Sequence, residues 1–307
     1  MHNVSLKRKL LLLVPLFFLA FLISAVLKAQ TPNPGLTLFP VSFDLLVGQS
    51  ETKEGEINLK NNTGQNVTIQ TTVRNFTATG EEGQVDITDE ETPFSLSEWM
   101  TITPEKQQVK QGETVKFEYK ITPPENAEAG GHFGSVVFAT VPDANLEGSG
   151  ALLSQEVAAI FLVRVPGAVV EKASIETFKT DKNFYEFGPV DFSIRVKNEG
   201  GVHVRPAGVI TIQNMWGGKD VFGFEGRNVL PNSIRQMPAI WTSTWLIGKY
   251  DANLALTFGS KNEQLYATTS FWAFPWRVGL VVLAVLIVLF LFRKRLYRAL
   301  KIILKGS

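Results

Sequence analysis

The residues best suited to chemistry in this chain of 307 residues are two histidines in glycine-rich stretches. His203 precedes Arg205 in "NEGGVHVRPAG", residues 198–208, and His132 lies in "GHFGS", residues 131–135. Neither stretch is a catalytic or metal motif, because the G-x-S-x-G elbow is missing and no second histidine stands at ligand spacing. We therefore expect no catalytic residues, no metal ligands and no cofactor, and the protein is not expected to be an enzyme.

The pattern around His203 is typical of a turn between two strands. The residues 198–201 follow an alternating strand, and their glycines can take positive φ at no steric cost. Val202 and Val204 then resume the apolar row, so we expect His203 and Arg205 to point into solvent.

An acidic stretch between Glu81 and Glu91 is the other candidate for chemistry. Ca²⁺ takes several oxygen ligands from such loops, but the spacing matches no EF-hand. A calcium site and a solvated charged loop both stay open as interpretations.

The two ends of the chain indicate export and a membrane anchor. Residues 1–30 hold a basic start and an apolar run, which predicts a signal peptide, with an uncleaved signal anchor as the alternative. Residues 271–292 are long and apolar enough to predict one transmembrane helix. Trp272 and Trp276 are predicted to lie at its outer membrane interface. The basic tail 293–307 follows, and its first three residues are predicted to lie at the inner interface: Arg293, Lys294 and Arg295.

The charge distribution supports this arrangement. The positive-inside rule places the tail in the cytoplasm and the larger part of the chain outside the membrane. All 29 acidic residues lie within residues 30–274, with 19 of the 30 Lys and Arg, so this segment carries a net charge of about −10. Such a segment repels phosphate backbones, which argues against a nucleic-acid partner. The chain has no cysteine, which excludes disulfides and thiol chemistry.

Period-2 alternation dominates the segment between the two apolar ends. Residues 190–197, 115–121 and 67–74 alternate apolar and polar side chains, as strands of antiparallel sheets do when one face is buried. The predicted fold class is all-β: two tandem immunoglobulin-like antiparallel β-sandwich domains, followed by one transmembrane α-helix. The predicted domains are residues 31–167 and 168–270. The segment 142–156 is predicted to be a hairpin loop, with a boundary near residue 150 as the alternative.

A short internal repeat supports two copies of one plan. The stretches "LKNNTGQNV", residues 59–67, and "VKNEGGVHV", residues 196–204, share the pattern apolar-K-N-x-x-G-x-x-V. Each stretch lies at the corresponding point of its predicted domain.

The chain resembles the WxL-interacting-protein family of bacterial cell surfaces. In the first domain the resemblance runs through "PVSFDLLVGQSETKEGEINLKNNTGQNVTIQTTVRNFTA" and "VKQGETVKFEYKITPPENAEAGGHFGSVVFA". In the second it rests on Leu230-Pro231-Asn232-Ser233 and Gly248-Lys249-Tyr250, while residues 198–208 depart from the family pattern. The resemblance implies a peptidoglycan-binding-like first domain and a role in attachment or scaffolding. No individual binding residue transfers from it.

We therefore expect a non-enzymatic, single-pass protein of the cell membrane whose extracytoplasmic part binds cell-wall polymer or another surface protein. No small-molecule substrate is expected. The alternative is a membrane-bound sensor or assembly subunit that acts through its transmembrane helix and basic tail. Trp216, Trp241 and Trp245 are candidate partner contacts, although we expect at least two of them to pack in the core.

Overall fold

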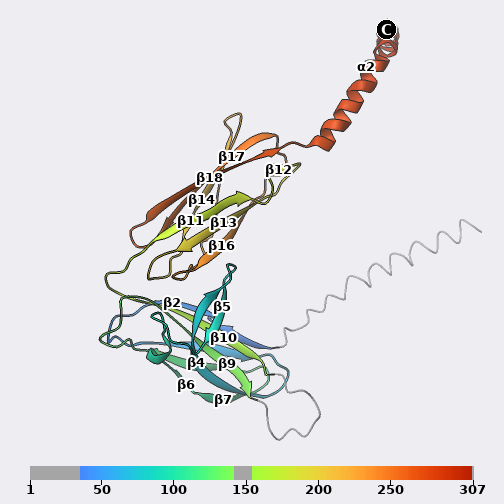
Figure 1. Ribbon diagram of the computed structural model, residues 1–307. Helices are drawn as coiled ribbons and strands as arrows, with labels where there is room; N and C mark the ends of the chain where they lie inside the picture. The colour runs from blue at the N-terminus through green and yellow to red at the C-terminus, as the bar shows by residue number, and fades with distance from the viewer. Residues whose placement is uncertain (1–34, 142–153, 306–307) are drawn as a thin grey trace, which may run out of the picture.

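The computed structural model describes residues 35–141 and 154–305, without the side chains of residues 296–305. Two β-sandwiches are followed by one long helix that leaves the second sandwich at its far end (Figure 1). The predicted signal segment 1–30 and most of the predicted loop 142–156 lie outside the described residues. The all-β prediction is confirmed.

The first sandwich has two sheets. One has the strand order β1-β3-β8-β6, and the other has the order β2-β10-β9-β4-β5, with β7 also paired to β4. The strands are β1 (Leu36–Phe39), β2 (Ser42–Leu46), β3 (Lys53–Asn61), β4 (Val67–Thr79), β5 (Gln84–Thr88), β6 (Met100–Thr103), β7 (Lys106–Val109), β8 (Thr114–Ile121), β9 (Gly130–Val141) and β10 (Glu156–Val165), with a short 3₁₀ turn η1 (Ser97–Trp99) before β6.

The second sandwich also has two sheets, ordered β11-β13-β16 and β12-β18-β17-β14-β15. Its strands are β11 (Ala173–Thr180), β12 (Phe184–Tyr185), β13 (Val190–Asn198), β14 (Ala207–Asn214), β15 (Lys219–Phe224), β16 (Ile234–Trp241), β17 (Gly248–Phe258) and β18 (Glu263–Ala273). The segment 166–172 joins the two sandwiches, and we propose a domain boundary there, as the sequence also predicts.

Alternation along the strands builds each core. In β8 the apolar side chains of Val115, Phe117, Tyr119 and Ile121 are buried, and the polar side chains between them are exposed. The strand β13 follows the same rule from Val190 to Val196. Each sandwich therefore has its own cluster of buried apolar side chains between its sheets.

Two strand pairs depart from the expected antiparallel arrangement. Strand β2 pairs with β10 in parallel, and the short strand β12 pairs in parallel with the end of β18. Both partners come from distant parts of the chain, so no alternation pattern within one segment could indicate their direction. In the first sandwich the chain passes from one sheet (β1) to the other (β2) across Pro40-Val41.

The internal repeat forms the same local structure in both sandwiches. Asn61 and Asn198 are fully buried, and each Nδ2 donates to the carbonyl four residues later, at 2.8 Å. Each Oδ1 accepts the backbone N–H two residues later, from Thr63 at 3.0 Å and from Gly200 at 2.8 Å. Each Nδ2 also reaches a carbonyl of a second segment, that of Val109 in the first case. The shared asparagine therefore ties its turn to a neighbouring strand or loop.

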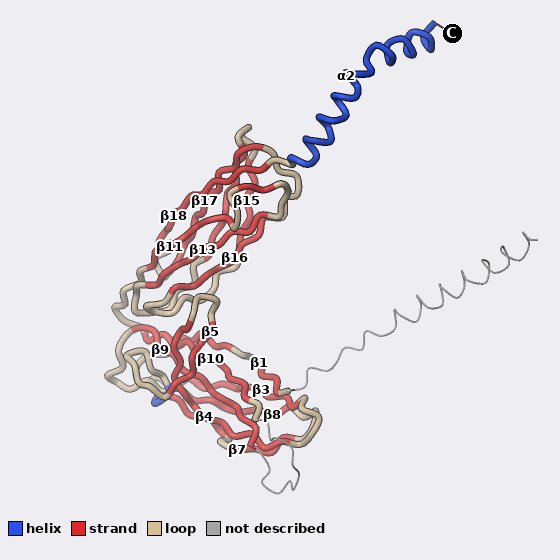
Figure 2. Tube along the Cα trace, turned by 45° about the vertical axis from the view of Figure 1, so that its right-hand side comes forward, coloured by secondary structure: helices blue, strands red, loops and turns tan. Residues whose placement is uncertain are grey.

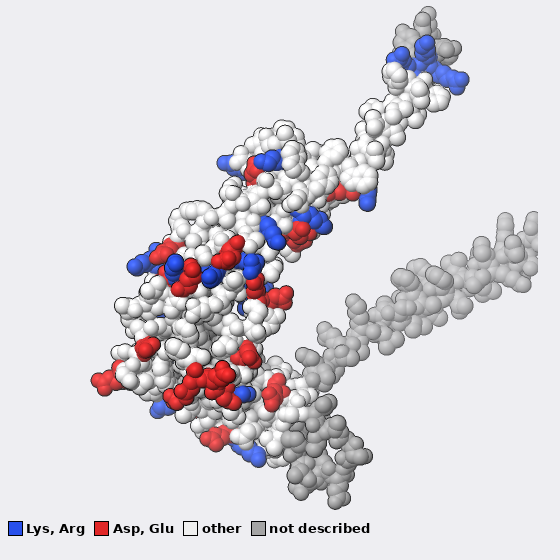
Figure 3. Space-filling view, in the orientation of Figure 1, with Lys and Arg blue, Asp and Glu red and all other residues white. Residues whose placement is uncertain are grey.

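The helix α2 (Trp276–Lys305) begins later than the apolar run suggests. Residues 271–273 end β18, and Phe271 and Ala273 are buried in the second core. The prediction of a helix from residue 271 is wrong at this end, because an apolar strand end and an apolar helix are alike in composition. Within residues 276–295, an 18-residue window has a mean hydropathy of 2.3 and none of it is buried in the protein, so α2 has the length and composition to cross a membrane. Figure 3 shows this stretch as largely uncharged, with basic side chains gathered toward its far end.

We expect Asn61→Ala to lower the free energy of unfolding of the first sandwich by about 2–4 kcal/mol, because several buried backbone groups lose their partner. Asn198→Ala should act in the same way on the second sandwich. Chemical denaturation of the full chain, followed by tryptophan fluorescence and circular dichroism, measures both. Asn62→Ala is the matched control, since Asn62 is only half-buried and donates to the hydroxyl of Thr37. Equal effects of Asn61→Ala and Asn62→Ala would contradict the structural role of the repeat.

Candidate functional site

The hairpin of β4 and β5 reaches from the first sandwich to the second (Figure 2). At its tip, the backbone N–H of Gln236 donates to the carbonyl of Glu81 at 2.7 Å. The guanidinium of Arg195 donates to both oxygens of the Glu81 carboxylate, at 2.6 and 2.5 Å. This bidentate pair holds the pKa of Glu81 below its usual value. The hairpin thus covers part of the exposed edge of β16.

The acidic stretch that contains Glu81 is used for pairing and solvent exposure. Asp89 accepts two hydrogen bonds from Arg74, at 2.7 and 2.9 Å, within the first sandwich. Among the described residues, no group of three or more acidic or histidine side chains is arranged to hold a metal ion. Two carboxylates of the acidic stretch, those of Glu81 and Asp89, are thus paired with arginines.

A close backbone contact joins the two sandwiches beside this hairpin. The N–H of Gly131 donates to the carbonyl of Gly201 at 2.9 Å. A Cβ on Gly130 would lie 2.8 Å from the oxygen of Gly201, and a Cβ on Gly131 would lie 3.2 Å from Cα of Val202. Glycine at both positions therefore allows the two backbones to approach.

His203 is buried at this contact, so the prediction that it points into solvent is wrong. Its side chain is 1% exposed, and Nε2 lies 3.1 Å from Oδ1 of Asp44 on β2. The ring also packs edge-on against Phe133. Val202 and Val204 are buried as predicted. His203 lies in the loop between β13 and β14, where residues 202–204 are all buried, and the first sandwich covers its side chain.

In the second histidine stretch, His132 and Ser135 serve structural roles. Both ring nitrogens of His132 face backbone carbonyls, those of Ser95 at 3.2 Å and Glu128 at 3.0 Å. The hydroxyl of Ser135 donates to the carbonyl of Arg74. His132 and Ser135 are thus each committed to the backbone.

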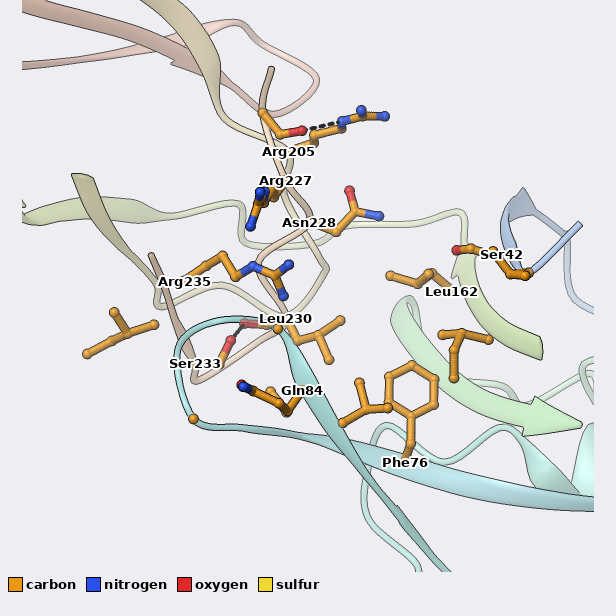
Figure 4. Close-up of a pocket in the computed structure, with 18 of the residues that line it drawn as sticks. Ser42, Phe76, Gln84, Leu162, Arg205, Arg227, Asn228, Leu230, Ser233 and Arg235 are labelled. Carbon is orange, nitrogen blue, oxygen red and sulfur yellow. Dashed lines mark hydrogen bonds between the residues drawn. The ribbon is translucent and has the colours of Figure 1, made fainter. Parts of the chain in front are cut away.

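A cleft of about 760 Å³ lies between the sandwiches (Figure 4). Its floor on the first sandwich is apolar and includes Phe76, Ile160 and Leu162. The second sandwich contributes three arginines, Arg205, Arg227 and Arg235. Other lining residues include Ser42, Gln84, Glu225, Asn228, Leu230 and Ser233. The cleft is therefore apolar on one side and basic on the other.

Two of the three arginines are held in place by neighbouring groups. Nε of Arg205 donates to the carbonyl of Gly226 at 2.9 Å, which fixes its side chain at the cleft. The guanidinium of Arg235 packs against Gly83 at the hairpin tip, where a Cβ would lie 1.5 Å from one of its nitrogens. Buried Nε of Arg235 has no hydrogen-bond partner among the described residues. Burial, and then the neighbouring Arg227, lower the pKa of Arg235 below its usual value.

This arrangement can hold an anionic group. The lining contains three guanidinium groups and one carboxylate, that of Glu225, so the local charge is opposite to that of the acidic segment around it. Guanidinium groups bind carboxylates and phosphates through paired N–H donors. Of the two lining serines, Ser233 donates to the carbonyl of Leu230, and the lining contains no histidine to act as its base.

The linear spacing of Arg205, Arg227 and Arg235 does not predict that they meet. They come from a loop before β14, a loop before β16 and β16 itself. The sequence offered one indication of a basic site: three arginines occur between residues 205 and 235 of a segment whose net charge is negative.

The three candidate contact tryptophans lie outside the cleft. Trp241 is buried in the second core, where its indole N–H donates to Asp220 at 2.7 Å, so it cannot contact a partner directly. Trp216 and Trp245 are each 65% exposed, so the expectation that at least two of the three pack in the core is wrong. Both stand in loops, to which strand alternation does not apply. The predicted interface residues Trp272 and Trp276, and Arg293, Lys294 and Arg295 on α2, are also exposed.

Comparison with known proteins confirms the family resemblance over the first sandwich. Residues 31–140 match the family model described as WxL Interacting Protein, peptidoglycan binding domain. No curated protein matches the chain. The matched family is one of cell-surface binding domains and is not known as an enzyme family.

Solved structures with a similar fold include bacterial fimbrial chaperones. The class 5 fimbriae chaperone CfaA is 11% identical, with 77% of this chain and 99% of that chain covered, at a TM-score of 0.41. The E. coli chaperone DraB is 13% identical, with 76% and 95% covered, at a TM-score of 0.38. At these TM-scores the similarities carry no argument about function.

We expect the stability of the junction between the sandwiches to fall as the pH drops below the ordinary histidine value of 6.5. Burial, opposed by Asp44 and assisted by Arg164, lowers the pKa of His203. Protonation would also bury a second N–H, because Nδ1 has no partner among the described residues. The unfolded chain therefore binds the proton first, and stability is lost between the unfolded and the folded pKa.

Chemical denaturation of wild type and His203→Gln at a series of pH values measures this effect. Both proteins carry the same carboxylates, so the difference between their pH slopes isolates His203. The slope of the wild type should exceed that of the variant by up to one proton. Parallel slopes below pH 6.5 would show that His203 is not the titrating group.

Proposed function

We propose that this chain, whose residues 31–140 match the peptidoglycan binding domain of WxL-interacting proteins, is a non-enzymatic, membrane-anchored protein of the cell surface. Its two sandwiches lie on the outer side of the membrane, and α2 crosses it once, with the basic tail in the cytoplasm. The sandwiches bind an anionic polymer of the cell wall.

The observation that carries this proposal is the arginine-lined cleft between the two sandwiches. An acidic surface alone would repel the carboxylates and phosphates of wall polymers. Three guanidinium groups beside an apolar floor provide a local site where such a group can bind while its uncharged neighbours pack against Phe76 and Leu162. A ligand seated there would contact both sandwiches at once.

A surface protein as the partner and a role as sensor or assembly subunit stay as alternatives. The basic residues at the end of α2 motivate the role as sensor or assembly subunit. That role requires that removal of the tail abolishes function even when the protein is correctly inserted. Deletion of residues 293–307 tests this, since a surface binder needs the tail only for correct insertion.

We expect Arg205→Gln/Arg227→Gln to weaken binding to isolated wall sacculi by about tenfold for each arginine, as a lost charge-assisted contact would. Full-length protein in detergent is co-sedimented with protein-free sacculi over a range of salt concentrations. Arg235→Gln forms a separate variant, since Arg235 also packs against the hairpin. Lys60→Gln/Lys179→Gln is the matched control, because these exposed lysines lie outside the cleft lining and their loss changes the net charge equally.

The form of the sacculi identifies the anionic group. Treatment with hydrofluoric acid removes phosphate-linked polymers and leaves the peptide carboxylates of peptidoglycan. Binding that survives this treatment assigns the cleft to a carboxylate, and binding that is lost assigns it to a phosphate. Binding only to walls that retain their proteins would replace the polymer by a surface protein. Equal loss in the lysine variant would remove the cleft from the proposal.

A further inference from the structure

Exposed apolar side chains gather at the end of the second sandwich from which α2 leaves. Four of them belong to two loops, the β14–β15 turn and the segment between β16 and β17. We call them the membrane-proximal patch: Met215, Trp216, Trp245 and Ile247, which are 59%, 65%, 65% and 46% exposed.

The two loops of the patch meet over the first residue of β17. A Cβ on Gly248 would lie 2.6 Å from Sδ of Met215 and 3.0 Å from the ring of Trp216, so both side chains lie over this glycine. The N–H of Met215 donates to the carbonyl of Lys249 at 3.0 Å, which fixes the β14–β15 turn beside β17. Trp245 packs edge-on against Phe187 in the loop after β12.

The start of α2 is tied to this same end. Gly248 is the register partner of Ala273, the last residue of β18 and only three residues before α2. The N–H of Phe274 donates to the carbonyl of Tyr185 at 2.9 Å. In the first turn of α2, Arg277 donates its N–H to Glu186 at 3.3 Å, and its Nε lies 3.4 Å from the same carboxylate. The helix therefore begins beside the patch, as Figure 1 shows for the ends of β17, β18 and α2.

We propose that the membrane-proximal patch docks into the headgroup region of the lipid bilayer that α2 enters. Tryptophan is enriched at this depth of the bilayer, because its ring is apolar and its N–H can donate to a polar partner. A large exposed apolar patch is costly in water and marks a binding surface. We assign the bilayer as the partner of the patch because only two residues connect β18 to α2. A bilayer that α2 enters therefore lies next to this end of the second sandwich.

Docking would set the orientation of the whole extracytoplasmic part. The second sandwich would stand on the membrane, and the arginine cleft, at its opposite end, would face away from it. This inference rests on the membrane insertion of α2 in the proposed function, so the test must separate the two.

The chain has no cysteine, so single reporter cysteines can be placed without background. Ile247→Cys carries an environment-sensitive fluorophore within the patch and leaves both tryptophans of the patch in place. Tyr266→Cys, on an exposed position of β18 away from the patch, is the matched water-exposed control, and Val285→Cys reports on α2. Full-length protein is reconstituted into vesicles of phosphatidylcholine and phosphatidylglycerol that carry nitroxide either at the headgroup or in the acyl chain.

We expect headgroup nitroxide to quench the label at residue 247 several-fold more than the label at residue 266. Acyl-chain nitroxide should quench the label at residue 285. Adding Trp216→Ser and Trp245→Ser to Ile247→Cys should lower quenching at residue 247 and leave residue 285 unchanged. Equal quenching at residues 247 and 266, with residue 285 in the acyl chains, would overturn the docking and keep the anchor. A label at residue 285 that stays in water would overturn the anchor, and the docking with it.

Discussion

The relative position of the two sandwiches depends on a backbone contact that side chains would block. Gly130 and Gly131 approach Gly201 closely enough for one direct hydrogen bond, and a Cβ at either glycine would press against the backbone of the second sandwich. At the same junction, the buried side chain of His203 in the second sandwich contacts Asp44 in the first. The same two sandwiches form the cleft, whose arginines come from the second sandwich and whose apolar floor comes from the first.

The repeated asparagine turn connects this junction to the architecture of each sandwich. In the first sandwich the turn at Asn61 ties two segments of one domain together. In the second, the turn at Asn198 does the same and also holds Gly201 at the surface, where the first sandwich meets it. The same asparagine turn thus stabilises both sandwiches, and its second copy also carries Gly201, which forms the hydrogen bond to the first sandwich.

The second sandwich has two unlike ends. The cleft, with its three guanidinium groups, lies where the sandwiches meet, and the exposed tryptophans lie beside the first turn of α2. The net negative charge of residues 30–274 makes the basic cleft an exception to its surroundings, so an anionic ligand would be attracted there and repelled elsewhere. The basic cleft and the exposed apolar side chains thus lie at opposite ends of the second sandwich.

The sequence by itself determined the strands and the apolar helix, because burial of one sheet face imposes alternation, as in β8 and β13, and a long apolar run can be read directly from the residues. It also indicated the turn at residues 198–201 from its asparagine and glycines. Only the tertiary structure decided what covers an outward side chain. His203 lies in a loop and is buried by the first sandwich, Phe271 belongs to a strand within an apolar run, and the cleft arginines meet from separate segments. Local periodicity reports which face a residue takes in its own sheet, whereas contact between domains depends on residues far away in the chain.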